Sequence, residues 1–182
     1  MEIKTLEVKN ISHYERGSEE TPCYNATVYI NGRKAIEVSN DGHGGCDRQH
    51  TYPEIEERGL VQKANEWCVK KFGQKSFTYQ SDDGEEVCTY DIDLEQYCHD
   101  ELYKWLDTKI LKRDLKKHYL FVEGTELKGY KKRANDTDET FKQFFKQNHP
   151  NEKCLNFLPF DDALKLFKEC AWWNIIFMTF LE

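Results

Sequence analysis

The chain has 182 residues, of which 38% are hydrophobic and 14% aromatic, and it carries a formal net charge of -7. This aromatic content excludes an intrinsically disordered chain, and the length is sufficient to bury a sizeable core in one domain or two small ones. An acidic chain is also a poor non-specific binder of nucleic acid, because such affinity comes from Lys and Arg side chains that neutralise phosphates.

The cysteines and the apolar segments indicate a cytoplasmic protein. The N-terminal residues contain no charged-then-apolar leader, and the longest apolar stretch, residues 171–181, is too short to span a bilayer. The seven cysteines include no C-x-x-C pair, so they fit neither a disulfide framework nor a zinc ribbon. We therefore expect reduced thiols in the cytoplasm. The sequence does not indicate an oligomeric state.

Residues 1–53 are predicted to form an N-terminal β-hairpin module. The predicted strands are residues 2–11, 23–30 and 33–39. An Asn-Gly dipeptide at positions 31 and 32, flanked by alternating apolar residues, predicts a tight two-residue turn between the last two strands. The module is therefore expected to be a small antiparallel sheet whose last strand leads into a glycine-rich loop, residues 39–47.

Residues 54–182 are predicted to form a helical α+β body. Apolar spacings of three and four predict helices over residues 55–72 and 93–115, in a segment capped by Thr137, and from about Phe160. Expected strands are residues 75–79 and 86–92, which form a second hairpin, and residues 119–122, with Gly124 and Gly129 marking turns. Residues 172–181 either continue the last helix or form a buried strand. The fold class is therefore α+β, with an N-terminal antiparallel hairpin packed with several amphipathic helices in one compact domain.

Charge is segregated along this body. Residues 82–101 hold nine acids and no Lys or Arg, whereas residues 104–133 hold ten bases and four acids. Such segregation permits a basic face for RNA and an acidic face for a basic protein. The two stretches could equally pair with each other or with helix dipoles.

The glycine-rich loop combines three glycines with titratable or metal-ligating side chains. These side chains are Asp41, His43, Cys46 and Asp47. Together with His50 the loop contains an H-x-x-C-x-x-x-H array whose ligand types suit zinc, and Asp41 and Asp47 would suit a divalent ion that prefers oxygen. Its glycine amides could instead bind phosphate, or the segment could be a plain connection.

Metal-free cleavage of RNA is a further chemistry that these residues permit. A base takes the 2′-hydroxyl proton and an acid protonates the leaving oxygen, and histidine suits both roles near neutral pH. The candidate catalytic residues are His13, His43 and His50, with Glu15 or Asp41 as carboxylate partners. At the predicted hairpin tip, Arg33 and Lys34 could hold the phosphate or stabilise its developing charge.

Two segments resemble small proteins carried by phages and other mobile elements of bacteria. They are residues 24–46, YNATVYINGRKAIEVSNDGHGGC, and residues 111–124, LKRDLKKHYLFVEG. Within that group, the length and the N-terminal hairpin are similar to a type II-A anti-CRISPR protein that acts on the guide RNA of the type II effector nuclease. The resemblance implies an inhibitor in the cytoplasm of the bacterial host, whose N-terminal β-hairpin causes guide-RNA truncation once the effector is present.

The resemblance also suggests which surfaces act. Stacking and cationic groups for RNA would come from Tyr24, Tyr29, Arg33 and Lys34. The acids expected to dock on the basic RNA or DNA channel of the effector are Asp82, Asp83, Glu85 and Glu86. Two modes of action remain open: an effector-dependent ribonuclease activity on guide RNA, and a non-enzymatic acidic module that blocks guide-RNA loading or DNA binding. A divalent metal ion as cofactor is also left open.

Overall fold

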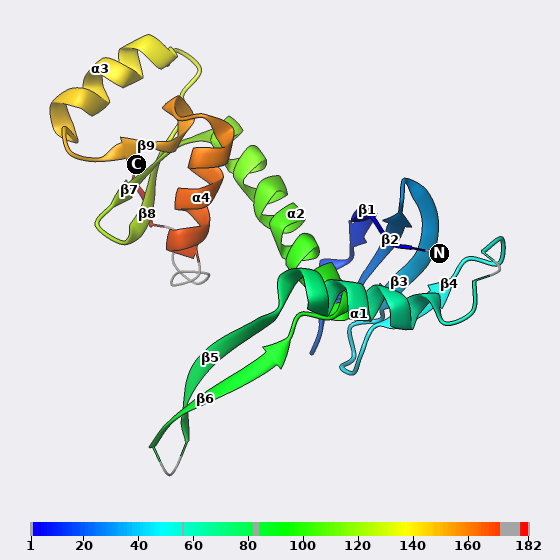
Figure 1. Cartoon of the computed structure of the whole chain (residues 1–182). Helices are drawn as coiled ribbons and strands as arrows, with labels where there is room; N and C mark the ends of the chain where they lie inside the picture. The colour runs from blue at the N-terminus through cyan, green and yellow to red at the C-terminus, as the bar shows by residue number, and fades with distance from the viewer. Residues whose placement is uncertain (1, 56, 82–83, 172–178, 182) are drawn as a thin grey trace. The chain divides into compact units, whose positions relative to one another are not determined.

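The computed structural model describes residues 2–55, 57–81, 84–171 and 179–181 (Figure 1). Within these ranges, helices and mainly antiparallel sheets, with one parallel pair of strands, give the predicted α+β class. The chain divides into two compact units, unit 1 (Met1–Tyr103) and unit 2 (Lys104–Glu182). The boundary falls inside helix α2 (Leu94–Lys117) and not after residue 53, where the predicted N-terminal module ends.

Unit 1 is built on an antiparallel sheet with the strand order β1-β2-β3-β4. The strands are β1 (Leu6–His13), β2 (Tyr24–Ile30), β3 (Arg33–Asn40) and β4 (Arg48–Thr51), with a short 3-10 helix, η1 (Glu15–Gly17), between the first two. Alternate residues of the central strands, such as Val28, Ile36 and Val38, are completely buried, as period-2 patterning requires. The three strands predicted in this part of the chain are confirmed, and β4 is an addition to them.

The predicted turn between β2 and β3 is also confirmed. Asn31 and Gly32 both have positive φ, 51° and 78°, as a two-residue hairpin loop needs. The Asn31 side chain also holds the N-terminal segment: its Oδ1 accepts from the backbone N–H groups of Lys4 (2.8 Å) and Thr5 (3.1 Å), and its Nδ2 donates to the Glu2 carbonyl (2.8 Å).

Helix α1 (Leu60–Phe72) begins later than the predicted start at residue 55. Gly59, with φ 68°, lies in the left-handed region, so the helix can begin only after it. Leu60, Ala64 and Cys68 line its buried face at the expected spacing of four residues. At the start of α2, the backbone N–H of Leu94 donates to Asn65 Oδ1 of α1 (3.0 Å).

The second predicted hairpin forms a two-stranded ribbon, which we call the β5–β6 arm. It consists of β5 (Gln74–Ser81) and β6 (Gly84–Asp91). Almost every residue of both strands is exposed. Figure 1 shows the arm extending away from the sheet of unit 1, beyond the end of α1.

Unit 2 contains a sheet with the order β10-β8-β7-β9. Its elements are β7 (His118–Glu123), β8 (Glu126–Lys131), α3 (Asp138–Asn148), β9 (Lys153–Cys154), η2 (Leu155–Phe157), α4 (Phe160–Ala171) and β10 (Thr179–Leu181). One core cluster centres on Leu111, Leu120 and Phe167, and another on Tyr119, Phe121 and Phe141.

In unit 2 the predicted helix cap is confirmed, whereas one of the predicted turns is wrong. The Thr137 cap of α3 is confirmed, since its side chain accepts from the Thr140 backbone N–H. The prediction of a turn at Gly129 is wrong, because Gly129 lies within β8, where an added Cβ would approach Leu120 Cδ2 to 2.9 Å. Of the C-terminal segment, residues 172–178 lie outside the described part, and Thr179–Leu181 form a strand. No helix among the described residues combines the length and apolar character that crossing a bilayer requires.

Candidate functional site

Asn40, at the end of β3, organises the glycine-rich loop. Its Oδ1 accepts from Thr21 Oγ1 (2.7 Å) and from the Gly42 backbone N–H (2.9 Å), while its Nδ2 donates to the Gly45 carbonyl (3.2 Å) and to Asp47 Oδ1 (3.1 Å). The Gly44 N–H donates to Thr21 Oγ1 (3.2 Å). Because internal acceptors already use these two loop amides, the loop does not form an open anion-binding nest. Its bonds instead fix the position of Asp47.

Asp47 is a buried carboxylate with three side-chain partners. Its side chain is 0% exposed. Oδ2 accepts from the hydroxyl of Tyr24, and Oδ1 accepts from Asn40 and lies 3.3 Å from His99 Nε2. Burial raises the pKa of the Tyr24 hydroxyl far above its ordinary value, and the Asp47 carboxylate adds to the rise. Tyr24 is therefore a permanent hydrogen-bond donor to Asp47.

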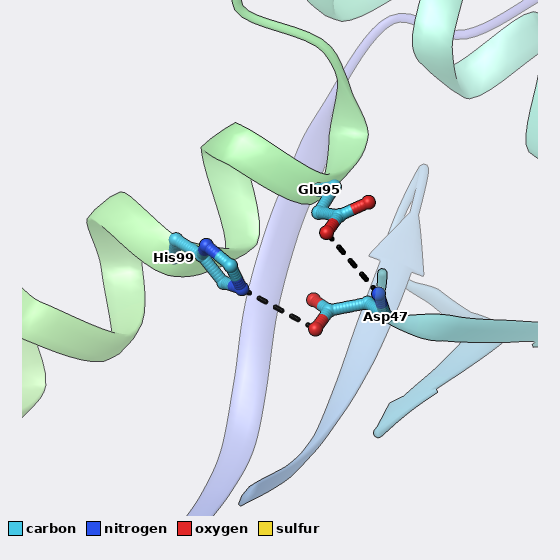
Figure 2. A group of neighbouring side chains, drawn as sticks. All are labelled: Asp47, Glu95 and His99. Atoms are coloured by element: carbon cyan, nitrogen blue, oxygen red, sulfur yellow. Dashed lines mark hydrogen bonds and ion pairs between the residues drawn. The ribbon is translucent and has the colours of Figure 1, made fainter. Parts of the chain in front are cut away.

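Glu95 and His99 complete a group that we call the Asp47–Glu95–His99 cluster. Both residues project from the first turns of α2 toward Asp47, as Figure 2 shows, because a spacing of four residues places them on one face of the helix. Glu95 Oε1 accepts from the Asp47 backbone N–H (3.1 Å). One ligand atom from each residue lies within 4.8 Å of the others, a separation at which a metal ion could be held.

His99 combines a perturbed pKa with partial exposure. The hydrogen bond to Asp47 raises its pKa, and the charges of Asp47 and Glu95 contribute in the same direction. Its side chain is 22% exposed, and its Nδ1 has no hydrogen-bond partner among the described residues. Because Nε2 faces Asp47, Nδ1 is the nitrogen available for exchange of a proton with an incoming group.

The catalytic candidates from the sequence lie at the surface of unit 1 and do not form one constellation. His13 Nε2 is 3.1 Å from Ser18 Oγ, and His43 Nδ1 is 3.3 Å from Glu19 Oε2. Glu15 and His50 are exposed. Asp41 pairs with Arg48, and a hydrogen bond from the His43 backbone, together with Arg48, lowers its carboxyl pKa.

The side chains proposed as a zinc array do not form a metal-binding group in the described part of the chain. Two groups of His, Cys, Asp and Glu side chains in the described chain are close enough to hold a metal ion, and neither includes His43, Cys46 or His50. The first is the Asp47–Glu95–His99 cluster, which contains the sequence candidate Asp47. The second is Glu123, His149 and Glu152 in unit 2, where Glu123 already pairs with Lys128 and His149 Nε2 lies 3.0 Å from the Tyr130 hydroxyl.

The predicted RNA-binding residues are divided between surface and core. Arg33 and Lys34 are exposed at the start of β3. Tyr29 is half-buried, with the Lys9 ammonium 5.0 Å from its ring centroid. Tyr24 is only 1% exposed, so it presents no ring face for base stacking and acts instead as the donor to Asp47.

The predicted partner-binding acids belong to the β5–β6 arm. Asp82 and Asp83 lie outside the described residues, and Glu85 and Glu86 are exposed on β6. Glu86 accepts hydrogen bonds from the Tyr79 hydroxyl and from Ser81 Oγ, both at 2.7 Å, and these bonds lower its carboxyl pKa.

The same arm carries an aromatic face that the sequence analysis did not identify. The register pairs Phe77 with Cys88 and Tyr79 with Glu86, and the Phe77 ring lies 6.0 Å from Tyr79 and 6.1 Å from Tyr90. Phe77 is 51% exposed and Tyr79 is 43% exposed. On the opposite face, Val87 is 67% exposed. The alternation Phe77-x-Tyr79 was the available indication of a shared face.

Glu95 and His99 are the functional residues that the sequence analysis missed. Their E-x-x-x-H spacing within a predicted helix indicated a common face, but not the residue that they meet. The partner, Asp47, lies 48 and 52 positions away in the sequence.

No protein-family model matches this chain, and neither a curated protein nor a solved structure is significantly similar to it.

Proposed function

We propose that this protein is a binding inhibitor that places its β5–β6 arm in a basic, nucleic-acid-binding channel of another protein. Following the resemblance of residues 24–46, that partner is the type II CRISPR effector nuclease, and the bound arm blocks guide-RNA loading or DNA binding. The observation that carries the proposal is the exposure of Phe77 and Tyr79 on a ribbon rich in acids.

The arm has the chemistry of a docking element. An isolated two-stranded ribbon buries little apolar surface of its own, and exposed aromatic residues gain most when a partner covers them. Aromatic anchors surrounded by polar groups are also typical of the residues that dominate binding energy at interfaces.

The charge of the arm supports the choice of a basic partner. Residues 74–91 carry five acids and one lysine, and that lysine, Lys75, lies 2.5 Å from Asp100 at the base of the arm. The distal part is therefore uniformly acidic. A channel that binds phosphates is lined with Lys and Arg, so it complements this charge and accelerates association at low salt.

The proposal is tested by titrating the effector nuclease with the full-length protein. Replacing Phe77 and Tyr79 by Ser should weaken binding by about 30-fold or more, because loss of central aromatic anchors costs about 2 kcal/mol or more. The double variant Glu85→Gln, Glu86→Gln should bind more slowly and lose much of the salt dependence of association.

A matched control is available in the same unit. Glu19 and Glu20 are likewise consecutive and exposed, so Glu19→Gln, Glu20→Gln makes the same change in net charge away from the arm. Equal losses in the two charge variants would show that only net charge matters and would contradict docking by the arm. Unchanged affinity after substitution of Phe77 and Tyr79 would contradict it as well.

Guide-RNA truncation is the second candidate, and the His99–Asp47 pair favours it. A histidine held by a buried carboxylate, with its other nitrogen open, is suited to take the proton of a ribose 2′-hydroxyl. The 2′-oxygen would then attack the phosphorus, and the 5′-oxygen would leave with a proton from a second acid. Arg33 and Lys34 lie at the other end of β3 from Asn40 and Asp47, so they would bind a more distant phosphate of the same RNA.

A denaturing gel of guide RNA distinguishes the two candidates. Truncation requires shortened RNA when both effector and protein are present, and His99→Gln should abolish it if His99 is the base. Single His13→Ala, His43→Ala and His50→Ala variants test the histidines proposed from the sequence. RNA of full length in the presence of complete inhibition supports docking alone.

A further inference from the structure

We infer that the Asp47–Glu95–His99 cluster is a binding site for a zinc ion. The inference does not depend on docking by the β5–β6 arm, whose residues take no part in the cluster. It competes with the second candidate function, because zinc would occupy the His99 and Asp47 atoms that form that pair. The ligands would be Asp47 Oδ1, one carboxylate oxygen of Glu95 and His99 Nε2.

The spacing of the ligand atoms fits zinc. With Zn–N and Zn–O bonds of about 2.0–2.2 Å, two ligands of a tetrahedral ion are about 3.4 Å apart. His99 Nε2 and Asp47 Oδ1 are 3.3 Å apart. This separation suits two ligands of one zinc ion, which would lie to one side of the line joining the two atoms.

Electrostatics favour a cation at this point. Two carboxylates, one of them 0% exposed, lie close together, and within the described ranges neither forms an ion pair with Lys or Arg. A buried carboxylate without a compensating cation is costly. A zinc ion at this point would compensate both carboxylates.

The surroundings hold the ligands in place, as outer hydrogen bonds do in metal sites. Asp47 receives bonds from Tyr24 and Asn40, and its own backbone N–H binds Glu95 Oε1. Helix α2 fixes Glu95 and His99 one turn apart. These bonds hold Asp47 and Glu95 in place before a metal binds.

The ligand set selects zinc over magnesium or calcium. The imidazole nitrogen suits zinc, whereas magnesium and calcium prefer sites made of oxygen alone. Three protein ligands leave a fourth tetrahedral position, which water would fill, and this arrangement is typical of zinc sites that bind or activate a further ligand.

The second group of potential ligands in the described chain is less suitable. The Lys128 ammonium already neutralises Glu123, and hydrogen bonding to this lysine lowers the carboxyl pKa. His149 Nε2 is engaged with Tyr130. A metal ion there would have to displace an existing ion pair, so we assign the zinc to the cluster in unit 1.

The test is a competition titration of the full-length protein with zinc alone against a chromophoric chelator. We expect one zinc ion per chain, and at least a tenfold loss of affinity in His99→Gln and in Glu95→Gln. Glu95→Gln keeps an oxygen for the Asp47 backbone N–H but removes the charge, so it tests the site even if His99→Gln does not fold. Zinc should raise the unfolding temperature of the wild type and not of these variants.

Matched controls separate this site from incidental zinc binding. His43→Gln removes a surface histidine that is also 3.3 Å from a carboxylate, and His149→Gln tests the group in unit 2, so both should bind like the wild type. Cobalt substitution should show no thiolate-to-metal charge-transfer band, which excludes the exposed Cys46 and Cys88 as ligands. No bound zinc, unchanged affinity in His99→Gln and Glu95→Gln, or loss of binding in His149→Gln would each overturn the assignment.

Discussion

Gly42 is a loop position at which the structure leaves no space for a side chain. Its φ is +88°, and an added Cβ would lie 1.8 Å from the Gly17 carbonyl oxygen and 3.0 Å from Cys23 Cβ. The Gly42 carbonyl also accepts the backbone N–H groups of Glu19, Glu20 and Thr21, so the loop cannot shift without losing these bonds. We expect Gly42→Ala to destabilise the protein by at least about 4 kcal/mol in urea unfolding, because strain and a backbone clash combine.

Gly45 is the matched control for this prediction. It has nearly the same φ, +85°, but an added Cβ would meet nothing within 4 Å. Gly45→Ala should therefore cost only the conformational penalty, about 1–2 kcal/mol. Equal losses at the two positions would mean that backbone conformation alone, and not the close approach to Gly17, explains the glycines of this loop.

Cys68 should make the stability of unit 1 sensitive to alkaline pH. Burial raises the pKa of its thiol from 9.0 to about 12. Between these values the unfolded chain loses the thiol proton while the folded chain keeps it. The thiol's contribution is therefore complete below pH 9 and declines by about 1.4 kcal/mol per pH unit until pH approaches 12.

Urea unfolding at about pH 8 and about pH 10 measures this decline. Cys68→Ala should lower stability at both values but show a shallower decline, since it has no thiol to ionise. If the wild type and the variant decline in parallel, other groups are responsible, such as the Cys98 thiol, whose pKa burial also raises above its ordinary value of 9.0.

The residue types in the sequence indicated which segment contains a site residue, but not which side chains contact one another. The loop was identified because its residues are chemically reactive, and Asp47 does belong to the cluster. His43 and Cys46 are at least as reactive as Asp47, yet they face solvent. Contact with His99 depends on how α2 packs against the loop, and no local pattern encodes such a long-range contact.

Asn31 has two roles in the β2–β3 hairpin: its backbone adopts the positive φ of the turn, and its side chain binds the N-terminal segment. Substitutions can separate these two roles. Asn31→Gly keeps the positive φ but removes the three hydrogen bonds to residues 2–5. Asn31→Ala removes the bonds and adds backbone strain. We expect losses of about 1 and about 2 kcal/mol respectively, measured by thermal unfolding. Equal losses would show that the strained φ contributes nothing.

Both hairpins were predictable from alternation and turn residues, but their surroundings were not. Alternating Phe77 and Tyr79 are typical of a strand with one face buried. The structure leaves that face exposed, because periodicity shows which residues share a face and not whether another element covers it. The arm is thus the element for which the expected burial and the observed exposure differ most.

For the whole molecule, the division into two units was the least predictable feature. The boundary lies within a continuous helix that contains no glycine, proline or polar linker. Apolar residues continue along α2 on both sides of residue 103: Leu102 is buried in unit 1, and Leu111 belongs to a core cluster of unit 2. A sequence pattern that depends on periodicity cannot distinguish these two cores.

Separate cores should give separate unfolding transitions in calorimetry of the full-length protein. Gly42→Ala should lower the midpoint of one transition, and Leu120→Ala, which empties part of a core cluster in unit 2, should lower the other. A core Leu→Ala change costs about 2–5 kcal/mol, which for a unit of this size corresponds to a shift of about 8 °C or more. Each variant is the control for the other, because neither should move both transitions. A single transition lowered by both variants would show that α2 couples the two cores into one cooperative unit.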